Sequence, residues 1–417
     1  MKYYIIAGEA SGDLHGSNLM KGLYEEDPSA VIRFWGGDLM AEVYSRHQAD
    51  KASPAGARDG GRGIPCGEAG PGHGGGLVRH YKEGAIMGFW EVFTHAGKLL
   101  GNIRRCKRDI LDWNPDLVIL IDYPGFNFRI AEFAHRKGFR TFYYIAPKVW
   151  ASREGRIRKL KACVDKLYIV FPFEIPYFRK KGVAAEYLGN PLVDSIDGSR
   201  AMNETRQEFL ERNGLDDRPV IALLAGSRKG EISTMMPVLT EFAARMKSLP
   251  PYKDYQFIVA GAPARTMEDY SGFIARADAL YGSTGIKVIF GETQSIIRHA
   301  EAAVVNSGTA SLETVLLGTP QVVGYICNGL TYMIARHIVK IRHISLGNLI
   351  VDRSAFRELI QGDCNAENLV REVRALIEDK EYRSGMLKEY AAIRKALGGS
   401  GASRAVAASM IRELMRK

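Results

Sequence analysis

Two carboxylates in the first part of the sequence each follow a short apolar run. Glu9 lies in the turn Gly8–Asp13, directly after the run Tyr3–Ala7, and Asp122 closes the run Leu117–Ile121. A carboxylate at the carboxyl end of a parallel strand lies at the ligand crevice of a doubly wound sheet. Partial burial there raises its pKa and suits it to general-base catalysis. The sequence therefore predicts Asp122 as a candidate base, and a cap of the following helix or turn is the alternative.

The turn Gly8–Asp13 is placed to contact a ligand, but it matches neither of two common phosphate-binding patterns. Its spacing is not G-x-G-x-x-G, and the sequence lacks G-x-x-x-x-G-K-[ST]. These absences argue against a dinucleotide fingerprint and against a P-loop. Ser11, Gly12 and Asp13 are therefore candidate contacts for a different ligand. The alternative is a tight turn in which Asp13 or Ser11 caps the next helix.

Two turns in the second half of the chain are typical of phosphate sites. The first contains Gly226, Ser227 and Arg228, and the second is the run Ser307–Thr309. Each follows an apolar run and precedes a helical pattern, so backbone N–H groups and a guanidinium can hold an anion there. Glu313, one turn into the second helix, can accept hydrogen bonds from a vicinal diol such as ribose. Together the two turns indicate a nucleotide-diphosphate ligand, and capped turns with solvated cations are the alternative.

The stretch from 86 to 108 combines an aromatic end with a cluster of cations. Apolar side chains recur at helical spacing at positions 86, 89, 90, 93, 96, 100 and 103. Met87, Phe89, Trp90 and Phe93 are the apolar residues of this stretch that we expect to contact the acceptor or the membrane. Its cations are Arg104, Arg105, Lys107 and Arg108. This composition is typical of a helix at a membrane interface. A core-facing helix with a solvated basic end is the alternative.

Short β-branched and aromatic runs separated by helical patterns predict the elements that position these residues. The expected strands are Tyr3–Ala7, Val31–Trp35, Leu117–Ile121, Thr141–Ile145, Leu167–Phe171, Ala185–Leu188, Val220–Leu224, Gln256–Ala260, Lys287–Phe290, Ala303–Val305 and Gln321–Tyr325. Continuous apolar strands of this kind indicate parallel sheets covered on both faces. The alternation of apolar runs and helical patterns begins again after residue 215. We therefore expect an α/β protein with two doubly wound, Rossmann-like domains.

The domain boundary is expected near residue 195, where Pro, Gly, Asp and Ser interrupt the periodicity. We therefore expect an N-terminal domain over 1–195, a C-terminal domain over 196–385, and final helices over 386–417 that could pack on either domain. Residues 46–76 are rich in Gly and Pro and have almost no large apolar side chains. Such a segment cannot bury enough surface to order itself, which predicts a disordered insertion.

Composition restricts the class of protein. The chain has 417 residues, 46% hydrophobic and 25% charged, with a net charge of +10, which favours an anionic partner such as nucleic acid, a membrane surface or a phosphorylated substrate. Its five cysteines form no C-x-x-C pair, which argues against zinc and redox sites and fits a reducing cytoplasm. No stretch approaches the roughly 18 apolar residues of a spanning helix, and the first apolar run is too short for a signal peptide.

Taken together, several motifs resemble the lipid-A-disaccharide synthase family. They are AGEASGD, MGFWEV, LILIDYPGFN, YYIAPKVWA, FPFE, GNPLVD, LLAGSRKGEI, NSGTASLE and SLGNL. They occur in the family's order and cover nearly the whole chain outside 46–76. The resemblance implies a GT-B glycosyltransferase fold, with two Rossmann-like domains facing across a cleft. It also implies transfer of a diacylated glucosamine from UDP to the 6-hydroxyl of a diacylated glucosamine 1-phosphate, releasing UDP.

The resemblance also assigns residues by position. It implies that the UDP part of the donor is bound by Gly226, Ser227, Arg228, Ser307, Gly308, Thr309, Glu313 and Asn348. It places Glu9 and Asp122 near the acceptor, with Asp122 as the base. The sequence departs from the family at two positions, with Gly125 in place of the usual Asp and Gly347 in place of a frequent Pro. The first departure removes a rival base, and the second permits a looser backbone beside Asn348.

The implied reaction is a single displacement with inversion at the anomeric carbon. Arg228 and the turn Ser307–Thr309 can stabilise the departing diphosphate, and no Asp-x-Asp motif is placed to bind a metal, so we expect neither metal nor cofactor. The expected partners are the UDP-linked acylated glucosamine, the acylated glucosamine 1-phosphate and the anionic inner face of the inner membrane, with no nucleic acid. The alternatives are another GT-B glycosyltransferase, a UDP-sugar epimerase, or a non-catalytic protein that binds membrane or nucleic acid.

Overall fold

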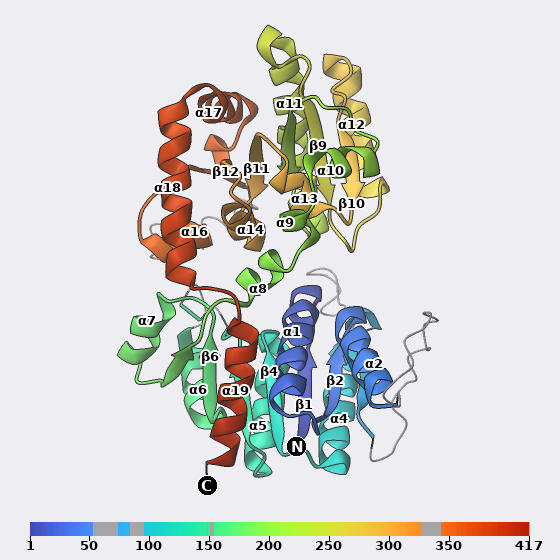
Figure 1. Cartoon of the computed structure of the whole chain (residues 1–417), viewed down its shortest axis with the longest axis vertical. Helices are drawn as coiled ribbons and strands as arrows, with labels where there is room; N and C mark the ends of the chain where they lie inside the picture. The colour runs from blue at the N-terminus through green and yellow to red at the C-terminus, as the bar shows by residue number, and fades with distance from the viewer. Residues whose placement is uncertain (53–73, 84–95, 148, 151–153, 327–342, 417) are drawn as a thin grey trace. The chain divides into compact units, whose positions relative to one another are not determined.

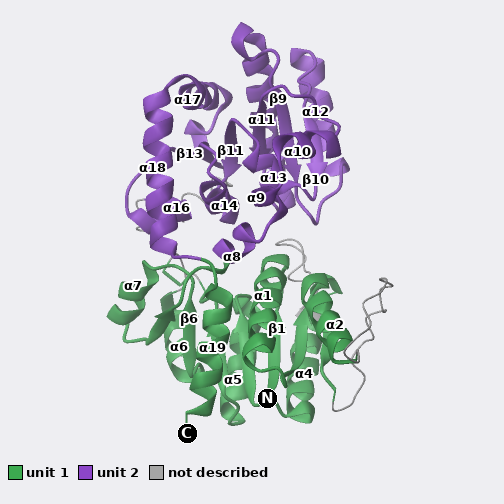
Figure 2. Ribbon diagram, in the orientation of Figure 1, with its two compact units in different colours: residues 1–191, 400–417 green, residues 192–399 purple. Residues whose placement is uncertain are grey.

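The computed structural model describes residues 1–417 except 53–73, 84–95, 148, 151–153, 327–342 and 417, and Figure 1 labels its elements. These residues form two compact units, shown in different colours in Figure 2. Unit 1 comprises residues 1–191 and 400–417, and unit 2 comprises residues 192–399. Each unit contains one sheet of parallel strands with helices between them. The predicted fold class, with two parallel-sheet α/β domains, is confirmed.

Unit 1 contains a sheet of seven parallel strands in the order β3-β2-β1-β4-β5-β6-β7. The strands are β1 (Lys2–Ala7), β2 (Val31–Gly36), β3 (Gly76–His80), β4 (Leu117–Ile121), β5 (Thr141–Tyr144), β6 (Lys166–Ile169) and β7 (Ala185–Tyr187). The helices are α1 (Ala10–Glu26), α2 (Asp38–Ala52), α4 (Ala96–Trp113), α5 (Pro124–Arg136), α6 (Ile157–Cys163), α7 (Glu174–Lys180) and α19 (Ala402–Met415), with 3₁₀ turns at Tyr81–Glu83 and Glu154–Arg156.

Unit 2 contains a sheet of six parallel strands in the order β10-β9-β8-β11-β12-β13. The strands are β8 (Val220–Leu224), β9 (Gln256–Gly261), β10 (Lys287–Phe290), β11 (Ala302–Asn306), β12 (Gln321–Tyr325) and β13 (Glu358–Ile360). The helices are α8 (Pro191–Asp197), which begins at the unit boundary, α9 (Arg200–Asn203), α10 (Arg206–Arg212), α11 (Lys229–Ser248), α12 (Glu268–Tyr281), α13 (Thr293–Arg298), α14 (Thr309–Leu317), α16 (Leu346–Val351), α17 (Ala366–Glu378) and α18 (Lys380–Leu397), with 3₁₀ turns at Pro250–Tyr252 and Gln361–Asp363.

The central strands match the predicted apolar runs because both of their faces are covered. Every residue of β4 and of β8 is buried. The sequence did not predict β3 and β13, which are edge strands. β3 contains Arg79 and His80 and is only partly buried, and β13 has three residues. Edge strands need less apolar surface, so their sequences carry a weaker strand signal.

Residues 46–52 belong to helix α2 and not to a disordered insertion, so the predicted insertion began too early. Two contacts explain why the helix continues. The His47 ring stacks on Tyr24 at 3.6 Å between centroids, and the Arg46 guanidinium pairs with Glu42 at 2.5 Å. At the other end, the segment from Gly76 forms strand β3. Residues 53–73 of the predicted insertion lie outside the described residues.

The last helix, α19, packs on α1 within unit 1, and this answers the question that the sequence left open. At Gly22 of α1, an added Cβ atom would lie 2.9 Å from the Cα atom of Arg404, so the two helices approach backbone to backbone. The Arg404 guanidinium also pairs with Glu26 at 2.7 Å, and Tyr168 in β6 donates a hydrogen bond to Ser409 at 3.2 Å. The chain therefore returns to unit 1 after completing unit 2.

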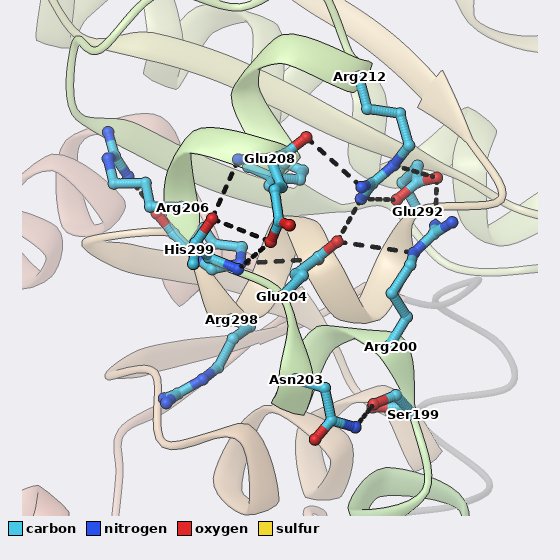
Figure 3. Close-up of polar contacts among 12 residues, drawn as sticks. Ser199, Arg200, Asn203, Glu204, Arg206, Glu208, Arg212, Glu292, Arg298 and His299 are labelled. Carbon is cyan, nitrogen blue, oxygen red and sulfur yellow. Dashed lines mark hydrogen bonds and ion pairs between the residues drawn. The ribbon is translucent and has the colours of Figure 1, made fainter.

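The segment that follows the unit boundary is held on unit 2 by a network of ion pairs (Figure 3). The Glu292 carboxylate, just before α13, pairs with Arg200 of α9 at 2.5 Å and with Arg212 of α10 at 3.0 Å. Arg212 also pairs with Glu204 at 2.5 Å. The side chains of Glu204 and Glu292 are only 4% and 13% exposed. These pairs tie α9 and α10 to α13, so removing the largely buried Glu292 carboxylate removes contacts to two arginines at once.

We expect Glu292→Gln to lower the free energy of unfolding by about 1–3 kcal/mol at pH 7, because the amide keeps the shape but loses the charge. Burial raises the pKa of Glu292, but hydrogen bonds from Arg212 and Arg200 outweigh it and hold the pKa below its usual value of 4.5. A lowered folded-state pKa contributes stability above pH 4.5 that is lost as the pH falls further. Urea unfolding at pH 7 and below pH 4 should therefore show a difference between variant and wild type that shrinks in acid.

A matched control is Glu241→Gln, which removes the pair between Glu241 and Arg245 on the surface of α11. The Arg245 side chain is 54% exposed, so this pair should be worth under about 1 kcal/mol. Equal losses for Glu292→Gln and Glu241→Gln would show that the network adds nothing beyond an ordinary surface pair.

Candidate active site

The carboxyl ends of β1 and β4 are neighbours in the first sheet, because Ala7 pairs with Ile121. The turn after β4 closes over the turn after β1. An added Cβ atom on Gly8 would lie 2.3 Å from the Tyr123 ring, so only glycine fits at this position. Burial raises the pKa of Tyr123 and the negative charge of Glu9 raises it further. The predicted residues Glu9 and Asp122 are thus carried by adjoining turns at one edge of the sheet.

The backbone at Asp122 adopts a conformation that is uncommon for residues other than glycine. Asp122 has a φ of 41° and Tyr123 a φ of 44°, both in the left-handed region. The Asp122 carbonyl accepts hydrogen bonds from the Asn127 side chain at 2.8 Å and from the Tyr143 hydroxyl at 2.6 Å. Strained conformations of this kind cost about 1–3 kcal/mol each and cluster at functional sites. The half-buried Asp122 is therefore held in a fixed orientation at the sheet edge.

Asp13, a predicted ligand contact, also has a role inside the fold. Asp13 is 3% exposed, and its carboxylate accepts backbone hydrogen bonds from Gly37 at 2.7 Å and from Leu39 and Met40 at 3.1 Å. It therefore caps the start of α2, and not the start of its own helix. The physical reason is that the first N–H groups of a helix lack partners within it.

The neighbouring residues of this turn differ in exposure. Ser11 and Glu9 are exposed at the start of α1, so they can reach a ligand. Gly12 is buried, and a Cβ atom there would lie 3.3 Å from the Cβ of Ala7. Gly12 thus lets α1 approach β1 closely. It contributes no side chain to the site.

Arg79 on β3 belongs to the same edge, and the sequence did not single it out. Its guanidinium lies 5.7 Å from the centroid of the Trp35 ring and donates a hydrogen bond to Asn102. Its positive charge opposes the rise of the Tyr123 pKa. Only the pairing of β3 with β2 brings Arg79 here, so the missed edge strand hid this residue.

Met87, Phe89, Trp90 and Phe93 lie outside the described residues. The described part of the predicted interfacial helix is α4, and its cations divide into two groups. Arg105 donates to the carbonyl of Val78 at 3.2 Å, and Lys107 lies 5.3 Å from the Phe133 ring centroid. Arg104 and Arg108 have no such contact among the described residues, and both are exposed, as is Arg105.

The exposed face of α4 also carries apolar side chains. Leu100 is 50% exposed and Leu111 is 44% exposed, whereas Ile103 is buried. The helical spacing in the sequence placed Leu100 and Ile103 on one apolar stripe. In the structure the two side chains differ in exposure, because only Ile103 is buried. At 100° per residue, positions 100, 104, 108 and 111 fall on one side of a helix. We call these four residues the α4 stripe.

In unit 2, the turn after β8 is closed by a carboxylate of the protein itself. Glu231 accepts hydrogen bonds from the backbone N–H of Ser227 at 2.9 Å and of Arg228 at 3.2 Å, and from the Arg228 guanidinium at 3.1 Å. Gly226 has a φ of 108°, which favours glycine. The backbone donors expected to bind phosphate here are therefore engaged by Glu231. The Arg228 side chain is nonetheless 75% exposed and can reach a ligand.

The turn after β11 leads into α14 and lies beside the turn after β8, because Val305 pairs with Leu224 in neighbouring strands. Gly308 and Thr309, at the start of α14, are exposed, and Ser307 is half-buried. Glu313 on the same helix is half-buried, and burial raises its pKa to about 7. Within the part of the chain that the structure describes, no group donates a hydrogen bond to its carboxylate. The second phosphate-type turn is thus an open helix N-terminus with an unsatisfied carboxylate one turn further on.

Asn348 has a role inside the fold. It is fully buried, and its side-chain N–H₂ donates to the carbonyl of Phe356 at 3.0 Å and to Glu358 at 2.9 Å. Its side-chain oxygen accepts from the backbone N–H of Ala355 at 2.9 Å. Asn348 therefore fixes the loop after α16. Gly347 beside it is packed closely, since a Cβ atom there would lie 2.8 Å from the Phe356 ring.

The described residues contain neither a candidate metal cluster nor a helix that could span a membrane. No group of three or more His, Cys, Asp or Glu side chains in these ranges could hold a metal ion. None of the helices that the structure describes is long and apolar enough to cross a membrane.

The comparison with protein families decides the identity. The model of the family Lipid-A-disaccharide synthetase matches residues 72–411. The chain belongs to this family. A lipid-A-disaccharide synthase from Syntrophus aciditrophicus (strain SB) is 35% identical over 417 residues, which cover 99% of this chain and 97% of the relative. The family membership makes the protein a glycosyltransferase of lipid A biosynthesis, and it confirms the resemblance found in the sequence.

Solved structures of other enzymes have a similar fold. The UDP-GlcNAc 2-epimerase from Neisseria meningitidis bound to UDP-GlcNAc has a TM-score of 0.62 at 12% identity and covers 99% of this chain and 100% of its own. A glycosyltransferase from Rickettsia africae ESF-5 has a TM-score of 0.57 at 12% identity and covers 100% and 99%. At these identities the likeness concerns the fold alone. The chain has the GT-B fold that the sequence resemblance implied.

Proposed function

We propose that this enzyme transfers 2,3-diacylglucosamine from its UDP-linked donor to the 6-hydroxyl of 2,3-diacylglucosamine 1-phosphate, with inversion at the anomeric carbon and release of UDP. The observation that carries the proposal is the pairing of an open helix N-terminus at Gly308 and Thr309 with the unsatisfied carboxylate of Glu313. The N-terminus suits a diphosphate, and the carboxylate suits the vicinal diol of a ribose. The Neisseria meningitidis epimerase, which shares the fold, was solved with UDP-GlcNAc bound, and this supports a UDP-sugar as the donor.

The acceptor is assigned to unit 1. Asp122 takes the proton of the acceptor 6-hydroxyl as its oxygen attacks the anomeric carbon, and the bond from that carbon to the diphosphate breaks. The rigid backbone at Asp122 supports this role because a base must be held at a fixed distance from the hydroxyl. Glu9 and Ser11 are exposed on the adjoining turn and are assigned to contacts with the acceptor sugar.

The donor is assigned to unit 2. Arg228 and the turn Ser307–Thr309 stabilise the charge that develops on the departing UDP, so the proposal requires no metal ion. Gly226 and Ser227 shape the turn that presents Arg228. Asn348 supports the donor site indirectly. Its side-chain amide forms hydrogen bonds within the loop after α16 and so fixes that loop.

A coupled assay of UDP release tests the proposal. UDP should appear when the acylated donor and the acylated acceptor are both present, in a one-to-one ratio with the disaccharide. Replacing the acceptor with glucosamine 1-phosphate, which lacks acyl chains, should lower kcat/KM strongly. UDP release that does not depend on any acceptor would contradict the proposal.

The role of Glu313 predicts how nucleoside binding depends on pH. The ionised carboxylate accepts hydrogen bonds from both ribose hydroxyls, and protonation removes that capacity. Since burial raises the pKa of Glu313 to about 7, uridine should bind more weakly as the pH falls from 8 to 6. Uridine avoids the titration of a phosphate, and titration calorimetry measures its affinity. Glu313→Gln should bind uridine more weakly at pH 8 and should lose the pH dependence.

Control ligands and a stability measurement complete this test. 2′,3′-Dideoxyuridine, which has no diol, should bind with little pH dependence. A carboxyl group whose pKa is raised by folding destabilises the protein as the pH rises above its unfolded value, so Glu313→Gln should raise the Tm at pH 8 more than at pH 5. A pH dependence that survives in Glu313→Gln would assign it to another group.

We propose further that the enzyme binds the anionic inner face of the inner membrane through the α4 stripe. Both substrates carry acyl chains, so the enzyme must reach them at a lipid surface. Leu100 and Leu111 offer exposed apolar surface, and Arg104 and Arg108 lie on the same side of the helix. Each cation near an anionic surface contributes about 1 kcal/mol at modest salt.

The double variant Arg104→Glu/Arg108→Glu should bind vesicles of anionic lipid at least tenfold more weakly than wild type in a sedimentation assay. High salt should weaken the wild-type binding, because it screens the charges. The matched control is Lys253→Glu/Lys388→Glu, which makes the same change of charge at exposed positions of unit 2. Equal loss of binding in both double variants would indicate an effect of net charge and not of the α4 stripe.

A further inference from the structure

Asn306, the last residue of β11, is a buried residue whose side-chain amide has no hydrogen-bond partner among the described residues. The residue is 5% exposed. Within the ranges that the structure describes, its side chain neither donates nor accepts a hydrogen bond. An amide that no protein group satisfies, on a side chain this well enclosed, is available to hydrogen-bond a ligand. Neither the sequence patterns nor the family assignment gave this residue a role.

The place of Asn306 in the fold indicates where such a ligand lies. It directly precedes the turn Ser307–Thr309, at the carboxyl end of its strand. Its amide nitrogen lies 2.7 Å from the position of an added Cβ atom on Gly226, in the neighbouring turn. The side chain therefore points between the turn after β8 and the N-terminus of α14. Gly226 is required here both by its φ of 108° and by this amide.

The chemistry around Asn306 favours an anion. The backbone N–H groups of Ser227 and Arg228 donate to the Glu231 carboxylate and are engaged. What the two turns still offer to a ligand is the N-terminus of α14, the exposed guanidinium of Arg228 and the amide of Asn306. All three donate hydrogen bonds. A diphosphate needs several converging donors of this kind.

We propose that the Asn306 side chain donates a hydrogen bond to the diphosphate of the donor nucleotide and holds it at the N-terminus of α14. This inference rests on the proposed function and adds a residue to its donor site. Glu231 then acts as a fixed anion that shapes the turn after β8. Because Glu231 engages the backbone N–H groups of that turn, Asn306 provides the hydrogen-bond donor in their place. The ligand class is a nucleoside diphosphate, and the contact is made to phosphate and not to the nucleoside.

The test compares the affinities of UDP and uridine by titration calorimetry. Asn306→Ala should weaken UDP binding about tenfold, which corresponds to about 1.4 kcal/mol, and should change uridine binding less than twofold. Asn306→Asp keeps the shape but places a negative charge beside Glu231 and the diphosphate, so it should weaken UDP binding more than Asn306→Ala does. Thermal unfolding checks that each variant folds. If Asn306→Asp does not fold, the comparison of Asn306→Ala with wild type still decides.

The matched control is Asn203→Asp, which adds the same charge at an exposed position of unit 2 and should leave the affinity for UDP unchanged. An unchanged affinity for UDP in Asn306→Ala would overturn the inference, and so would parallel losses of UDP and uridine. Wild-type enzyme that does not bind UDP would overturn the proposed function as well. Conversely, a selective loss of UDP binding in an enzyme that forms no disaccharide would uphold this inference and refute the proposed function.

Discussion

Replacing Asp122 with asparagine is expected to lower kcat by about 10²- to 10⁴-fold, because the amide cannot take the proton of the acceptor hydroxyl. The substitution should leave the fold intact. Asparagine tolerates the left-handed conformation that Asp122 adopts, and the substitution keeps the backbone carbonyl that accepts hydrogen bonds from Asn127 and Tyr143. The affinity for UDP should stay within about twofold of wild type, since the donor is assigned to unit 2. Steady-state kinetics and UDP titration measure the two quantities.

Two comparison variants sharpen this test. Asp112→Asn removes an exposed carboxylate from the same unit and should leave kcat unchanged. Glu9→Gln tests the carboxylate on the adjoining turn. Full activity of Asp122→Asn would remove Asp122 from the mechanism, and a large loss in Glu9→Gln alone would transfer the role of base to Glu9.

Arg228→Ala should reduce kcat/KM by an amount equal to about 2–4 kcal/mol of transition-state stabilisation, because the guanidinium neutralises charge on the departing diphosphate. The turn itself should persist. Glu231 still accepts hydrogen bonds from the backbone N–H groups at 227 and 228 after the side chain is removed. The affinity for UDP should fall as well, and the Tm should change little, since the side chain is 75% exposed.

Lys229→Ala is the matched control for Arg228→Ala. Lys229 is the next residue, is also exposed and carries the same charge. Removal of the Lys229 side chain should change kcat/KM much less than removal of Arg228. The reason is that Arg228 is proposed to contact the diphosphate directly, and not only to add positive charge near the site. Similar losses in both variants would reduce Arg228 to one of several interchangeable cations.

The sequence predicted most of the fold because buried parallel strands leave a strong apolar signal. The runs Leu117–Ile121 and Val220–Leu224 became β4 and β8 without change of bounds. β3 was missed since an edge strand carries Arg and His where a central strand carries apolar residues. β5 ended one residue early because Ile145 adopts a φ of 62°, which the apolar run did not reveal. Local patterns therefore identified all the core strands and missed two of the four edge strands that the structure describes, β3 and β13.

The candidate site was predictable where a motif also fixes the geometry. Ser307–Thr309 lie at a helix N-terminus, as the spacing of small residues indicated. The pattern could not show that Asp13 caps a different helix, because that contact joins residues far apart in sequence. The same limit applies to Arg79 and Asn306, whose surroundings depend on strand pairing. Residue type and spacing give candidates, and long-range packing decides what each one does.

The most direct test of the proposed reaction is product analysis with purified enzyme, UDP-2,3-diacylglucosamine and 2,3-diacylglucosamine 1-phosphate. We predict one UDP for each disaccharide formed, with the new linkage at the 6-hydroxyl and an anomeric configuration opposite to that of the donor by nuclear magnetic resonance. A linkage that retains the donor configuration would contradict a single displacement by the acceptor hydroxyl with Asp122 as its base. Conversion of the UDP-sugar into its epimer without disaccharide would contradict the proposed reaction itself.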